Sequence, residues 1–69
     1  MVYEEGDFVV IRNDIECGKM YGDIEADNTH VKISGLVVGI CRIRDTLYSE
    51  HYITHTGEFI TDKMIECKA

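Results

Sequence analysis

The strongest constraint on the fold is that strand-forming apolar residues occur in short runs bounded by turn-forming residues. The predicted strands cover residues 7–12, 30–33, 36–44, 47–54, 59–60 and 65–67. No stretch keeps the apolar spacing of an amphipathic helix over three turns. The sequence therefore predicts an all-β fold.

The arrangement of these runs favours one small domain over residues 1–69. Residues 14–28 are polar, contain two glycines and are predicted as a long first loop. Thr61 and Asp62 have the chemistry of a helix N-cap, but so few residues follow that we expect only a 3₁₀ turn before the last strand. About five short strands, a long first loop and a late 3₁₀ turn are typical of an SH3-like barrel.

Alternation within the predicted strands separates a core face from an outer face. In residues 36–44 the odd-numbered positions are all apolar or small, whereas the even-numbered positions end in two arginines. We therefore expect the odd positions to lie in the core. In the first strand we expect Val9 and Ile11 to point inward and Phe8 and Val10 to pack under the long loop.

Charge is distributed unevenly along the chain. The 69 residues hold 13 acids and 7 bases, a formal net charge of −6, and the whole excess lies in residues 1–28. Such a balance argues against binding DNA, RNA or anionic lipid by bulk electrostatics. No apolar run approaches a membrane span and no signal-peptide pattern begins the sequence, so we expect a cytoplasmic protein with no membrane partner.

Several short motifs follow one another in a familiar order. They are G-D-F-V-V-I-R-N-D at residues 6–14, then Gly18, Tyr21-Gly22 in the long loop, Gly35 before the central strand and F-I-T-D-K-M-I-E at residues 59–66. This order resembles the small SH3-like barrel proteins of phages and prophages of Gram-positive bacteria, the YorP-type group. The resemblance implies the barrel fold and a phage or prophage origin, and it implies no catalytic residue. The sequence departs from the group at two places: Lys63 replaces the usual glutamate, and the loop after Gly22 is acidic where the group tends to be apolar and aromatic.

The acidic stretch at residues 23–27 is the main candidate binding site. If it is extended, Asp23, Glu25 and Asp27 share one face at a spacing of about 6.6 Å, comparable with neighbouring phosphates of a nucleic-acid strand. The hypothesis is that this edge imitates a phosphate backbone and binds the basic surface of a nucleic-acid-binding protein. The alternative is a solvated loop that keeps a small protein soluble.

Tyrosines provide a second candidate surface. Tyr48 and Tyr52 are predicted to share one face of their strand, and Tyr21 lies beside the acidic stretch. Small barrels bind peptides on such aromatic surfaces, although packing in the core and at its rim is the plainer account of these tyrosines. Similarly, Arg42 and Arg44 suit either an anion or cross-strand ion pairs.

Metal sites are not expected. Residues 23–27 resemble the opening of a calcium loop, but Asn28 replaces the required glycine and Ser34 replaces the bidentate glutamate. His51 and His55 would lie about 13 Å apart in a strand, too far to share one ion. We interpret each histidine, His30 included, as a hydrogen-bonded packing residue.

Catalytic chemistry has no clear signal in the sequence. Cys17, Cys41 and Cys67 are far apart and odd in number, which fits small core or incidental residues in a reducing environment. No nucleophile elbow, phosphate loop or zinc-protease motif is present. We therefore expect no enzyme and no cofactor, but a non-catalytic module that binds a basic protein partner; the alternative is a structural domain that acts as a homo-oligomer.

Overall fold

The computed structural model describes residues 3–34 and 39–69. Its elements are β1 (Phe8–Ile11), β2 (Met20–Tyr21), β3 (Ile24–Glu25), α1 (Asn28–Ser34), β4 (Ile40–Leu47), η1 (Tyr48–Glu50), β5 (His51–Thr54), β6 (Phe59–Thr61), η2 (Asp62–Met64) and β7 (Ile65–Lys68), where η denotes a 3₁₀ turn. The chain is mostly β, as predicted, with one short helix.

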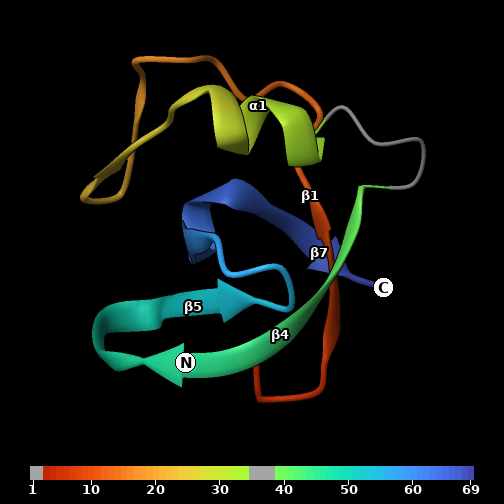
Figure 1. Cartoon of the computed structure of the whole chain (residues 1–69). Helices are drawn as coiled ribbons and strands as arrows, with labels where there is room; N and C mark the ends of the chain where they lie inside the picture. The colour runs from red at the N-terminus through yellow and green to blue at the C-terminus, as the bar shows by residue number, and fades with distance from the viewer. Residues whose placement is uncertain (1–2, 35–38) are drawn as a thin grey trace.

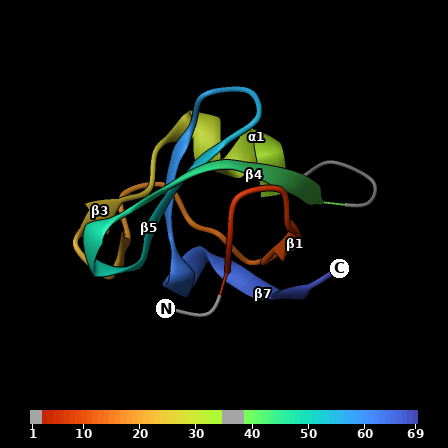
Figure 2. The same cartoon turned by 90° about the horizontal axis from the view of Figure 1, so that it is seen from below.

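The five longer strands form one antiparallel sheet in the order β6-β5-β4-β1-β7, and β2 pairs separately with β3. Strand β4 is the longest and pairs with β1 along one edge and β5 along the other. Figure 1 shows α1 across the top of the molecule, and in Figure 2 β4 passes in front of it. No ladder joins the end strands β6 and β7 in the described part of the chain, so the sheet is not closed.

The core contains the residues that strand alternation predicts. Val9 and Ile11 of β1 and Cys41 and Ile43 of β4 are all buried, which confirms the inward face of both strands. The prediction for Phe8 is wrong: its side chain is 51 % exposed, because it lies on the outer face of β1. Part of the predicted central strand, residues 36–38, lies outside the described residues.

The predicted strand at residues 30–33 is wrong, because these residues form α1. Asp27 is its N-cap: its Oδ1 accepts hydrogen bonds from the backbone N–H groups of Thr29 (2.9 Å) and His30 (3.3 Å). His30 and Ile33, one turn apart, are both buried against the sheet. Capping and tertiary packing therefore outweigh a local pattern too short to distinguish helix from strand.

The sequence also predicts a tight connection at Asp45 and Thr46, between the strands expected at residues 36–44 and 47–54, and this prediction is wrong. Asp45 and Thr46 do not turn the chain but pair with Ile53 and Tyr52 of β5, and the reversal occurs in η1. A bulge between Ile43 and Asp45 lets β4 bend while it stays in the ladder. By contrast, the expected 3₁₀ turn before the last strand is confirmed as η2.

Replacing Asp27 tests the cap of α1. We expect Asp27→Ala to lower the free energy of unfolding by about 1 kcal/mol, because two backbone N–H groups lose their acceptor. Asp27→Ser, which keeps a capping oxygen, is the matched control and should retain most of the stability in urea denaturation. Equal losses in the two variants would contradict the capping role.

Candidate functional site

An acidic hollow of about 510 Å³ lies between β3, the start of α1 and the β5–β6 turn. Three carboxylates line it: Glu25 from β3, Asp27 from the helix cap and Glu58 from the turn. Phe59, 55 % exposed, adds an aromatic ring to the wall. No lysine or arginine is among the described residues that line it, so the hollow favours a cation.

His30 fixes the relative position of two walls of this hollow. Its Nδ1 accepts a hydrogen bond from Asp27 N–H (3.1 Å), and its Nε2 donates to the Phe59 carbonyl (2.7 Å). Because a carbonyl only accepts and a backbone N–H only donates, these bonds assign the neutral tautomer with hydrogen on Nε2. The predicted hydrogen-bonded packing role of His30 is thus confirmed, although on a helix.

Glu58 is held in place by its own turn. Its carboxylate accepts hydrogen bonds from the hydroxyls of Thr54 and Thr56, and its backbone N–H donates to Thr54 Oγ1 (3.1 Å). Partial burial acts to raise the pKa of Glu58, but the two hydroxyl donors lower it, and the net direction is downward. The third carboxylate of the hollow therefore has a fixed position and a favoured negative charge.

A second, largely apolar hollow of about 290 Å³ adjoins the first. Thr29, Thr56 and Glu58 line both, so the two hollows share a wall. The floor of the second is formed by Ile33, Ile40 and Cys41, with Lys32 and His55 at its edge. Burial raises the pKa of the Cys41 thiol, which makes it a packing residue rather than a nucleophile at neutral pH.

The predicted row of three carboxylates is not formed, because β3 ends at Glu25. Asp23 Oδ1 lies 2.5 Å from His51 Nε2, so its carboxylate is engaged with β5. Asp27 caps α1, and within the described part of the chain no residue bonds the exposed carboxylate of Glu25. Asp27 and Glu25 therefore share the acidic hollow, whereas Asp23 has another role.

The prediction that Tyr48 and Tyr52 share one face is wrong, whereas the packing alternative is confirmed for Tyr21 and Tyr52. Tyr52 is fully buried and packs edge-on against Tyr3, with ring centroids 5.7 Å apart. Tyr21 is also buried, and its hydroxyl accepts a hydrogen bond from Glu16 N–H (3.0 Å). Tyr48 is 84 % exposed in η1, where its ring lies against His51. The turn at η1 breaks the alternation that would have placed Tyr48 and Tyr52 on one face.

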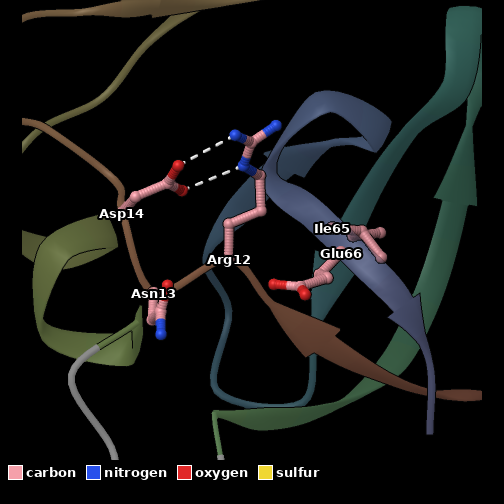
Figure 3. Close-up of a pocket in the computed structure, with 5 residues that line it drawn as sticks. All are labelled: Arg12, Asn13, Asp14, Ile65 and Glu66. Atoms are coloured by element: carbon pink, nitrogen blue, oxygen red, sulfur yellow. Dashed lines mark hydrogen bonds and ion pairs between the residues drawn. The ribbon is translucent and has the colours of Figure 1, made fainter.

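A third hollow, of about 380 Å³, lies beside β7 and is drawn in Figure 3. Arg12, the one cation among the described residues that line it, donates hydrogen bonds to Asp14 through Nε (3.0 Å) and Nη2 (2.9 Å). The hydrogen bonds from Arg12 lower the pKa of the Asp14 carboxyl. Since Arg12 and Asp14 already pair with each other, their charges are less available to a ligand than the carboxylates of the acidic hollow.

Arg44 forms an ion pair with Asp45 (3.3 Å), its neighbour in the same strand, so the predicted cross-strand geometry of this pair is wrong. The remaining titratable candidates are dispersed. His55 Nδ1 accepts a hydrogen bond from Arg42 N–H, and His51 forms hydrogen bonds with the Tyr48 carbonyl and the Asp23 carboxylate.

In residues 3–34 and 39–69 no three metal-binding side chains converge. No helix of this part of the chain is long and apolar enough to cross a membrane.

No protein-family model, curated protein or solved structure matches this chain.

Glu25 and Asp27 of the predicted acidic stretch line the hollow together with Glu58, Phe59 and Thr56, which the sequence did not single out. The turn at residues 55–58 can be recognised in the sequence, and the position of Glu58 directly after Gly57 was the one local indication of an acid in this turn. Its proximity to residues 25–27 depends on the packing of α1, which the sequence pattern did not predict.

The lowered pKa of Glu58 leads us to predict that the protein loses stability in acid. Its folded pKa lies below the ordinary value of 4.5, so its contribution is complete above pH 4.5 and is lost as the pH falls through the folded value. We expect Glu58→Gln to cost about 1 kcal/mol at pH 7 and progressively less toward pH 3, as measured by urea denaturation over a pH series. Thr56→Val, which removes one hydroxyl donor, should weaken the pH effect; a difference that stays constant with pH would contradict the assignment.

Proposed function

We propose that this chain is a non-catalytic module that binds a protein partner through an acidic surface. The observation that carries the proposal is the hollow lined by Glu25, Asp27 and Glu58. Complementary potentials steer a basic partner toward such a surface and favour its bound orientation. We propose a nucleic-acid-binding protein as the partner, because proteins of this class carry a basic surface that would complement the acidic hollow.

We also propose an SH3-like barrel as the fold and a cytoplasmic phage or prophage protein related to the YorP-type group. Support for the fold comes from the strand order, in which the bent β4 serves two half-sheets, and from the 3₁₀ turn between β6 and β7. A long first connection, between β1 and β4, carries the β2–β3 pair. Support for the relationship is the order of short motifs from residue 6 to residue 66.

A homo-oligomer is the second candidate. Phe59 is exposed on β6, a strand at the end of the sheet, and an exposed end strand can pair with another copy. Size-exclusion chromatography with light scattering separates the candidates, because assembly through β6 predicts a mass that rises with concentration. A mass that stays at that of one chain would exclude this candidate.

A charge-neutralised variant tests the binding module. We expect the double variant Glu25→Gln with Asp27→Asn to reduce capture of basic cytosolic proteins at low ionic strength, because two negative charges of the hollow are lost. Asn at position 27 can still cap the helix, so the variant should remain folded. Glu4→Gln with Glu5→Gln changes the net charge equally at exposed positions outside the hollow and serves as the matched control. Bound proteins are quantified by mass spectrometry at low and high salt.

Equal losses in the two double variants would show that net charge alone is responsible and would contradict the proposed surface. Capture that does not depend on salt would contradict it as well.

A further inference from the structure

The acidic and apolar hollows form one groove, defined here as the groove between α1 and the β5–β6 turn. Thr29 of α1 and Thr56 and Glu58 of the turn line both halves. The two halves have different chemistry, since one is acidic and the other is largely apolar. A ligand that fills the groove must therefore carry two different groups close together.

The acidic half selects a cation. Its lining includes three carboxylates and the exposed ring of Phe59, whose face also attracts a cation. An anionic ligand would be repelled by these charges. A lysine or arginine side chain fits, because its charged head meets the carboxylates while its apolar stem lies along the groove.

The apolar half selects an aliphatic group. Ile33 and Cys41 are buried at its floor, while Ile40 remains 37 % exposed and adds apolar surface that a ligand would cover. Removing this surface from water is favourable. A purely cationic ligand would leave this half unused.

The walls are held by the protein itself before any ligand binds. His30 joins the start of α1 to the Phe59 carbonyl, and the Thr54 and Thr56 hydroxyls hold Glu58. A groove with preset walls has less side-chain entropy to lose on binding.

Resting on the proposed function, we infer that the groove binds a segment of the partner in which a lysine or arginine lies close in sequence to an aliphatic residue. Charge complementarity fixes the first group and the apolar floor fixes the second. The partner is thus recognised through a short basic-aliphatic segment and not only through a broadly basic surface.

Synthetic peptides provide the test. Each holds one lysine and one leucine separated by a variable run of serines, and matched peptides replace the lysine or the leucine by serine. Binding to the ¹⁵N-labelled full chain is followed by NMR titration. We expect shifts at the amides of Thr29, Thr56 and Glu58, and about tenfold weaker binding when the leucine is replaced, because its burial is lost.

Two variants separate the halves of the groove. Ile40→Thr keeps a β-branched strand residue but removes apolar floor, and should weaken the lysine-leucine peptide about fivefold while leaving the lysine-serine peptide unchanged. Val31→Thr, on the exposed part of α1 and not lining the groove, is the matched control and should have no effect. Unchanged NMR spectra away from the substitution show that each variant is folded.

The outcomes distinguish this inference from the function on which it rests. If lysine peptides bind through Glu25 with or without the leucine, and Ile40→Thr has no effect, the groove inference is overturned while the acidic surface stands. If no peptide binds and capture of basic proteins is also independent of Glu25 and Asp27, both proposals fail.

Discussion

The fold depends on β4, the longest strand and the central one of the five-stranded sheet. Its inward side chains Cys41 and Ile43 are buried in the core, and its backbone pairs with β1 on one side and β5 on the other. The bulge between Ile43 and Asp45 lets β4 bend without ending the ladder. The remaining elements are arranged around this one strand.

The candidate site depends on a smaller feature, the buried side chain of His30. The ring bonds the backbone of Asp27 at the start of α1 and the backbone of Phe59 in β6, two segments far apart in sequence. Since a buried polar group without a partner is costly, these two bonds constrain where the helix can sit on the sheet. The consequence for function is that carboxylates from β3, the helix cap and the β5–β6 turn come to line one hollow.

The acidic residues that line the hollow differ in their structural roles. Asp27 caps the helix, and Glu58 closes its turn, so neither is simply a solubilising charge. Glu25 is exposed on β3 and bonds none of the other described residues, which makes it the best position for separating binding from folding. The hypothesis of an acidic surface therefore no longer concerns a single extended row of carboxylates but the acidic hollow, which three elements line.

The sequence alone determined the strand faces of β1 and β4, the 3₁₀ turn before β7 and the concentration of acids in residues 1–28, because alternation, turn chemistry and charge are local properties. Tertiary structure decided that residues 28–34 form a helix, since a pattern of seven residues fits either state and the cap and the buried His30 stabilise the helix. It also decided that Tyr48 and Tyr52 lie apart, because the η1 turn separates them. Above all, it brought Glu58 beside Glu25 and Asp27, a proximity that arises from packing between distant segments and has no local signature.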